Sequence, residues 1–226
     1  MRLKERREEF QLTLKNRFTA LDMEDMDIDS RSTLISSIVT EAAEEKEQRN
    51  KKPKKILRLR NQTDIPNVTV REVETAVKQM KDNKAPGTDD ISSDVYKIGG
   101  AEIITQLTRL NNQILTEKKI PAAWKEAKII LLHKKGDKED IKNYRPISLL
   151  SHAYKIFTRL IQNRIKIILD ENQPREYVKI LEDIHTNATA TIHIDKDVSK
   201  PIHIHRGVRQ GDTISLKIFT TAMEQH

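Results

Sequence analysis

Two groups of carboxylates could hold divalent cations, because Asp and Glu oxygens are the ligands that hard metal ions prefer. One is an acidic cluster of five side chains between positions 22 and 29, and the other is the chain's single Asp-Asp pair, Asp89 and Asp90. No feature of the cluster's spacing forces its carboxylates to converge on one ion. We therefore interpret the cluster as a solvated segment that leads into a helix.

Three histidines form a second candidate for metal chemistry. Residues 189–194 and 202–206 alternate apolar and polar side chains with a turn between them, which predicts a β-hairpin. His193, His203 and His205 fall on its polar positions. Zinc needs three or four converging ligands, and neither a cysteine nor a well-placed carboxylate accompanies them. A metal site remains an alternative, but the pattern favours a solvent-exposed face of the hairpin. We therefore assign no metal ligand.

Cations gather in two further segments. Residues 134–142 alternate charges of both signs without apolar periodicity, which indicates a solvated loop carrying spare lysines. Residues 49–60 contain no acid and include KKPKK at 51–55. Such a run binds phosphates, serves as a nuclear address, or is a solvated linker, and the sequence leaves these alternatives open.

The elements around the basic loop are predicted from hydrophobic pattern. The β-branched run Ala127–Leu132 predicts a strand buried on both faces, and Gly136 begins a turn. Pro146 fixes the chain direction, and Ser148 is expected to N-cap a long helix whose apolar stripe runs through 149–169. Other stripes predict helices over 1–19, 32–46, 69–81, 103–115 and 216–223. Trp124 is expected to anchor the fourth of these to the strand. The fold class is therefore α+β, mostly helical, with a small sheet.

Composition limits the classes of partner. Hydrophobic residues make up 36% of the 226 positions and charged residues 33%, and the net charge is +7. A basic balance suits a polyanion such as nucleic acid, although many soluble proteins are mildly basic. The absence of cysteine excludes a disulfide framework and a thiolate zinc site. No apolar run has the length of a membrane span, and the N-terminus lacks the apolar core of a signal peptide. We expect an intracellular, soluble protein without a membrane partner, and KKPKK weakly favours the nucleus over the cytoplasm.

Three blocks of sequence carry a resemblance to a known family. They are NKAPGTDDIS at 83–92, IPAAWKEAKIILLHKKGDKEDIKNYRPISLLSHAYKIFTRLIQNRI at 120–165 and RGVRQGDTIS at 206–215. In this order they closely resemble the reverse transcriptase of non-LTR (LINE-type) retrotransposons. The resemblance covers most of the chain from about Val70. The part before it resembles, more weakly, the linker between the family's endonuclease and polymerase.

The resemblance implies roles for individual residues. Lys128 and Arg145 match fingers positions that handle the nucleotide triphosphate and the template, while Gln210 and Gly211 match a pair that packs under the templating base. Expected phosphate contacts are Lys134, Lys135, Arg206 and Arg209. A structural salt bridge in the loop is the alternative role for Arg145.

The chain departs from the family where catalysis would be expected. The segment ENQPRE at 171–176 runs directly into YVKILEDIHTNATATIHI, so the block with the first catalytic aspartate is missing at Glu176/Tyr177. His226 precedes any YADD-type hairpin, and Asp89-Asp90 belongs to a different block. The family's Mg²⁺ ions are held by carboxylates that have no match here. We expect no catalytic residue, metal site or cofactor in this chain, and we expect Asp212 to cap the last helix.

The predicted organisation has three parts. Residues 1–68 form a helical and basic linker, 69–176 a fingers-like region, and 177–226 a partial palm with the hairpin and the helix of the last block. The leading hypothesis is an internally deleted, C-terminally truncated reverse transcriptase that contacts RNA or DNA, with a nucleotide triphosphate as a further candidate ligand, and has no polymerase activity of its own. Alternatives are a subunit that takes its carboxylates from another chain, a domesticated RNA- or DNA-binding protein, and a relic without function. The oligomeric state is not predicted.

Overall fold

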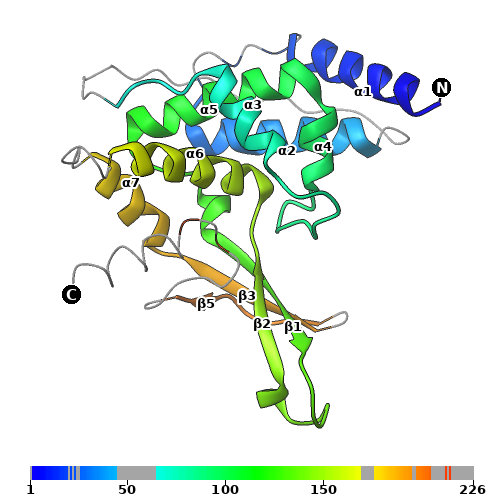
Figure 1. Ribbon diagram of the computed structural model, residues 1–226, viewed down its shortest axis with the longest axis vertical. Coiled ribbons are helices and arrows are strands. Elements are labelled where there is room, and N and C mark those ends of the chain that lie inside the picture. The colour runs from blue at the N-terminus through cyan, green and yellow to red at the C-terminus, as the bar shows by residue number, and fades with distance from the viewer. Residues whose placement is uncertain are drawn as a thin grey trace.

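The computed structural model describes residues 2–19, 21, 23, 26–44, 65–168, 176–194, 197–204, 212 and 214. Within this part a helical body stands at one end and a small sheet extends from it (Figure 1). The helices are α1 (Arg2–Thr19), α2 (Ile28–Glu44), α3 (Val70–Lys78), α4 (Ser93–Ile98), α5 (Gly100–Glu117), α6 (His152–Ile168) and α7 (Glu176–His185). The strands are β1 (Glu126–His133), β2 (Tyr144–Leu149), β3 (Thr189–Ile194), β4 (Asp197–Val198) and β5 (Ile202–His203). The α+β class, mostly helical with a small sheet, is therefore confirmed.

Helix α5 is the centre of the helical body. Its buried stripe includes Ile103, Leu107, Leu110 and Ile114, which recur at helical spacing and are at most 1% exposed. Helices α1, α2, α3 and α4 all pack against it, and α6 packs on α3. One continuous core of buried apolar side chains runs from Leu14 to Ile214, so all three predicted regions contribute to it.

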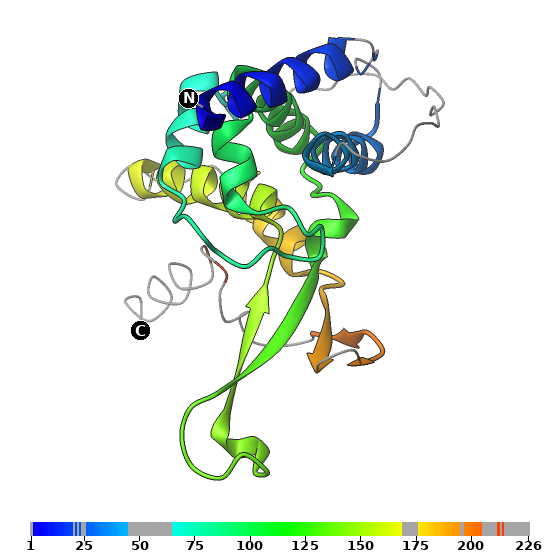
Figure 2. The ribbon, with the colours of Figure 1, turned by 90° about the vertical axis from the view of Figure 1, so that its right-hand side faces the viewer.

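The sheet has the strand order β2-β1-β3-β4, and β5 also pairs with β3. Strands β1 and β2 form an antiparallel hairpin, whereas β1 and β3 run parallel. A parallel pair needs a long crossover, which here passes through β2, α6 and α7. The β1–β2 hairpin projects away from the helices with the loop 134–143 at its far end (Figure 2).

Two local predictions around this hairpin are wrong. Strand β1 is not buried on both faces: only Ala127 of its residues is buried, and Leu132 is 51% exposed. The projecting half of the strand has no helix to cover it. Ser148 does not cap a helix, because it lies inside strand β2 and α6 begins three residues later than the predicted run, at His152. Pro146 is tolerated there because β2 is an edge strand, where one side of the backbone needs no donor.

The predicted helices are otherwise confirmed with shifted ends. The helix predicted over 32–46 begins at Ile28, and the one predicted over 69–81 ends at Lys78. Two short helices, α4 and α7, were not predicted. The expected helix over 216–223 and the KKPKK run lie outside the described residues.

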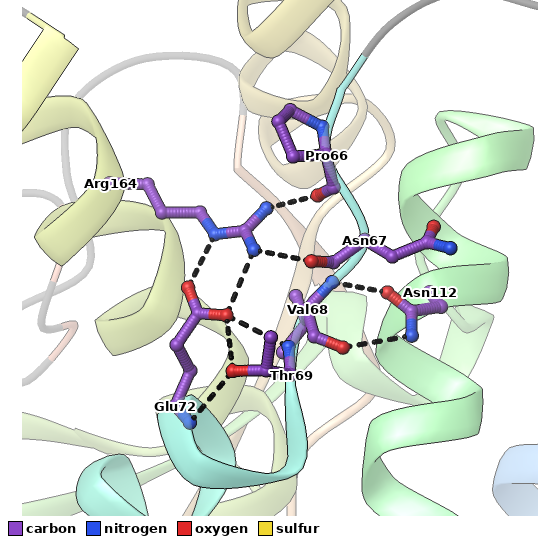
Figure 3. A network of polar contacts seen from close by, with 7 residues as sticks. All are labelled: Pro66, Asn67, Val68, Thr69, Glu72, Asn112 and Arg164. Carbon is purple, nitrogen blue, oxygen red and sulfur yellow. Dashed lines mark hydrogen bonds and ion pairs between the residues drawn. The ribbon is translucent and has the colours of Figure 1, made fainter.

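A polar network fastens the segment before α3 to the body (Figure 3). Thr69 and Glu72 form a capping box, in which the Thr69 hydroxyl oxygen accepts from the Glu72 N–H and the Glu72 carboxylate accepts from the Thr69 N–H at 2.8 Å. The Arg164 guanidinium, on α6, donates to both Glu72 oxygens at 2.8 and 3.0 Å. It also donates to the carbonyls of Pro66 and Asn67. One arginine therefore joins α6, α3 and the incoming chain.

Asn112 on α5 holds the same segment from the other side (Figure 3). Its side-chain oxygen accepts from the Val68 N–H at 2.5 Å, and its amide donates to the Val68 carbonyl at 3.1 Å. Both backbone groups of the buried Val68 are thereby satisfied without secondary structure.

Glu72→Gln is expected to weaken folding by about 1 kcal/mol at neutral pH, because it removes the charge that Arg164 pairs with. Hydrogen bonding from Arg164 holds the pKa of Glu72 at about 2, below its ordinary 4.5. A depressed carboxyl pKa stabilises the fold above the unfolded-state pKa and loses this effect as pH falls. The wild type should lose this contribution between about pH 4.5 and 2, and the variant should have none to lose.

The measurement is denaturant unfolding of both proteins across this pH window. Glu74→Gln, on the same helix but outside the network, is the matched control. Equal pH dependence in wild type and Glu72→Gln would contradict the ion pair's contribution.

Candidate nucleic-acid interface

Lys128 and Arg145, the two principal predicted contact residues, lie on one face of the sheet. In the hairpin register Lys128 pairs with Leu149, and Arg145 pairs with Leu132. Directly paired residues share a face and side chains alternate along a strand, so these two side chains point to the same side. They are four residues apart along β1, which is about 13 Å at the usual rise of a strand. Arg145 is exposed and Lys128 is half-buried.

The face that carries these cations is not the one that packs on the helical core. The opposite face contains the buried Ala127, Ser148 and Ala190. No residue on the cation-bearing face is fully buried, so within the described part of the chain this face is open. Its residues are Glu126, Lys128, Ile130, Leu132, Arg145, Ile147, Leu149, Thr189, Thr191, His193, Val198 and His203. We call this set the open face.

Lys134 and Lys135 lie at the start of the loop that closes the hairpin, and both are exposed. The Lys134 N–H donates to the Asn143 carbonyl at 2.8 Å, which continues the strand pairing into the loop. The Asn143 side-chain amide donates to the Asp137 carbonyl at 2.8 Å. Gly136 turns the chain with a φ of 90°, a conformation that a β-carbon disfavours.

A tyrosine and a histidine brace the same loop. The rings of His133 and Tyr144 are tilted at 60° with centroids 5.2 Å apart. The Tyr144 hydroxyl donates to the Lys138 carbonyl at 2.9 Å, and a His133 ring nitrogen lies 3.1 Å from the Gly136 carbonyl. The lysines are therefore presented from a loop whose backbone is held at several points.

The other predicted contacts are not placed. Arg206, Arg209, Gln210 and Gly211 lie outside the described residues. Asp212, next to them, is described and buried, and its carboxylate accepts from the Tyr154 hydroxyl at 2.7 Å and from the Ile214 N–H at 3.1 Å. Accepting from an N–H two residues ahead is how an N-cap side chain acts, but the helix over 216–223 that Asp212 is expected to cap lies outside the described residues. The bond to Tyr154 ties this block to α6 and was not predicted.

The 83–92 block docks on the first turn of α6. Gly87 lies so close that a β-carbon there would come within 2.4 Å of the Leu150 carbonyl carbon and the Ser151 nitrogen. The Ser151 hydroxyl donates to the Asp89 carboxylate at 2.6 Å, and His152 Nδ1 lies 2.9 Å from the Ile91 carbonyl. Asp89 thus has a structural partner. The glycine within a Pro-Gly pair was the only sequence signal for this close approach.

Burial shifts the titration of the groups around Asp89. It raises the pKa of Asp89 and, together with the Asp89 charge, raises the pKa of the fully buried Tyr96 hydroxyl. It lowers the pKa of His152 and of Lys155. Asp89 and Asp212 both favour the charged form of Lys155 and so oppose that shift. The junction is a polar core under α6 rather than an open site.

Metal ligands do not converge in the described residues. No group of three or more His, Asp or Glu side chains there could hold an ion. His193 and His203 share the open face, but His203 pairs with Thr189, four residues along β3 from His193. His205 lies outside the described residues.

No described helix has the length and apolarity needed to cross a bilayer.

Comparison with known proteins confirms the resemblance to non-LTR retrotransposon proteins. The chain is 36% identical over 110 residues to a probable RNA-directed DNA polymerase from transposon BS of Drosophila melanogaster, covering 48% of this chain and 12% of the relative. It is 36% identical over 99 residues to the RNA-directed DNA polymerase from mobile element jockey of the same organism, covering 43% of this chain and 11% of the relative. A 149 kDa protein of transposon TX1 from Xenopus laevis is 34% identical over 104 residues, 46% of this chain and 8% of the relative. The matched region is thus a small part of each relative. No family model matches the chain.

Gly87→Ala is expected to destabilise the fold by about 1–3 kcal/mol, because the added methyl group meets backbone atoms that cannot rotate away. Denaturant unfolding measures the loss. Ala85→Ser, an exposed substitution two residues earlier, is the control and should stay close to wild type. An unchanged Gly87→Ala midpoint would show that the block does not dock on α6.

Proposed function

We propose that this chain is a reverse-transcriptase-derived protein that binds RNA or DNA through the β1–β2 hairpin and the open face. The observation that carries the proposal is the placement of Lys128 and Arg145 on one open sheet face, with Lys134 and Lys135 exposed on the loop beyond them. The similarity to RNA-directed DNA polymerases supports the choice of nucleic acid as the polyanion.

The chemistry of the face suits a phosphate backbone. Arginine presents a planar fork that binds phosphate oxygens in pairs, whereas lysine acts as a point charge. At about 13 Å apart along β1, Lys128 and Arg145 are too far apart to bind one phosphate and can contact different phosphates of the same backbone. Ile130 and Ile147 lie between the two cations and give the face an apolar middle. Contacts with the phosphate backbone position a nucleic-acid strand on the protein without recognising its base sequence.

The proposal does not include nucleotidyl transfer by this chain alone. Two-metal polymerisation needs carboxylates that hold two ions roughly 3.5–4 Å apart. Asp89 is bonded to Ser151 beneath α6, and its neighbour Asp90 is exposed. By the resemblance to the family, the block that carries its first catalytic aspartate is missing between Glu176 and Tyr177. These features support a binding role that retains template-type contacts and lacks the catalytic aspartates. A nucleotide triphosphate is a further ligand for Lys128 and Arg145 under the same proposal.

The double variant Lys128→Ala/Arg145→Ala is expected to weaken binding to a short labelled RNA by about tenfold, the loss expected for roughly 1.4 kcal/mol. The slope of log affinity against log salt should fall by about 0.7 for each lost phosphate contact on a single strand. Fluorescence anisotropy over a range of salt concentrations measures both quantities.

The matched control is Lys119→Ala/Lys179→Ala, which removes the same charge from exposed positions on the helical side of the molecule. Equal weakening by the two double variants would mean that only net charge matters. The hairpin would then not be the interface.

Purified chain with primer–template, Mg²⁺ and nucleotide triphosphates is expected to yield no extended primer, because no carboxylates in the described part of the chain are brought together for two-metal catalysis. A gel-based extension assay with a viral reverse transcriptase as positive control tests this. Primer extension above the level of a reaction without the protein would overturn the proposal of a non-catalytic protein.

A further inference from the structure

Ile141 occupies an unusual position at the tip of the hairpin. Its side chain is 72% exposed, which is more than any other large apolar side chain among the described residues. It begins the short 3₁₀ turn Ile141–Asn143, in the loop farthest from the helical body (Figures 1 and 2). Nothing in the fold's core requires an apolar residue there, because the core lies at the other end of the hairpin.

The backbone around Ile141 is held on both sides. Asp140 caps the turn, since its carboxylate accepts from the Lys142 N–H at 3.0 Å. The Asp140 carbonyl accepts from the Asn143 N–H, also at 3.0 Å. Asn143 is in turn bonded to Lys134 and to Asp137. The turn therefore presents Ile141 in a defined direction instead of on a loose loop.

The loop that carries Ile141 also carries four lysines. Lys134, Lys135, Lys138 and Lys142 are all exposed in the same loop. The loop also contains three acidic residues. The carboxylates of two of them, Asp137 and Asp140, accept hydrogen bonds from loop backbone N–H groups at 2.9 and 3.0 Å. The tip thus combines one projecting apolar group with several lysines able to reach phosphates. Proteins that unstack base steps use the same combination of an apolar wedge and basic side chains.

We propose that Ile141 is a wedge that inserts at the junction between double-stranded and single-stranded nucleic acid. This inference rests on the proposed nucleic-acid binding and specifies the form of nucleic acid that the hairpin engages. Separating the last base pair at a junction costs less than opening an internal step, because one face of that pair is already unstacked. The lysines offset the remaining cost by contacting the phosphates of both strands. A lipid surface fits less well, since membrane binding needs a broad apolar face rather than one side chain.

The test uses the full chain and a forked RNA duplex with a fluorescent adenine analogue in its terminal base pair. Binding of the wild type should raise the analogue's fluorescence, because unstacking removes quenching by its neighbours. Ile141→Ser should abolish most of this rise and weaken fork binding by about tenfold, while single-strand binding stays within about twofold. Ile141→Leu should behave like wild type, because it keeps the apolar volume.

Leu12→Ser is the matched control, since Leu12 is a 59% exposed apolar residue on α1, away from the hairpin. A rise in fluorescence that is the same for wild type and Ile141→Ser would overturn the wedge, even where binding itself persists. Pelleting with anionic vesicles that depends on Ile141, without unstacking at the fork, would also overturn it in favour of a lipid surface. Failure of the wild type to bind forked, duplex and single-stranded RNA alike would instead overturn the proposed function.

Discussion

The packing of Trp124 against helix α6 is the contact on which the placement of the hairpin depends. Its ring lies edge-on to Tyr154 at 6.1 Å and tilted against Phe157 at 5.8 Å, and all three side chains are buried. Trp124 lies two residues before the start of β1, so this contact sets the point and direction in which the strand leaves the body. Aromatic pairs of this geometry contribute about 0.5–1.5 kcal/mol beyond the area they bury. The sequence predicted an anchoring role for Trp124, although its main partner is α6.

Other contacts secure the two ends of the same region. Asp183 on α7 accepts from the Ile120 N–H and from the Lys125 ammonium, both at 2.8 Å, on either side of Trp124. The returning strand β2 runs into Ser151, where Gly87 and Asp89 dock. Both roots of the hairpin are therefore fixed to the helical body, while its far half has no cover. A projecting hairpin whose two ends are fixed to the helical body is suited to contact a ligand that is too large to fit inside a cleft.

Within this hairpin the proposed tasks are separated by position. The open face has cations set apart along two strands, which suits neutralisation of phosphates on an extended backbone. The tip adds an apolar group that contributes nothing to the fold and has a backbone held by local hydrogen bonds. Phosphate contacts and base unstacking would thus be made by different parts of one hairpin. The buried polar junction under α6, with Asp89 and Asp212, connects this hairpin to the sequence block that follows β5.

The sequence by itself determined the helices with strong apolar stripes, strand β1, the β3–β5 hairpin pattern and the basic loop, because these depend on local periodicity and charge. It also contained the blocks that carry the family resemblance. Only the tertiary structure decided that residues 144–149 form an edge strand, since a Pro-containing segment before a helix reads locally as a turn. Only the structure showed that Lys128 and Arg145 share a face, that Asp89 bonds to Ser151, and that Arg164 joins three segments. Each of these facts depends on strand register or on contacts between residues distant in sequence, which local pattern does not encode.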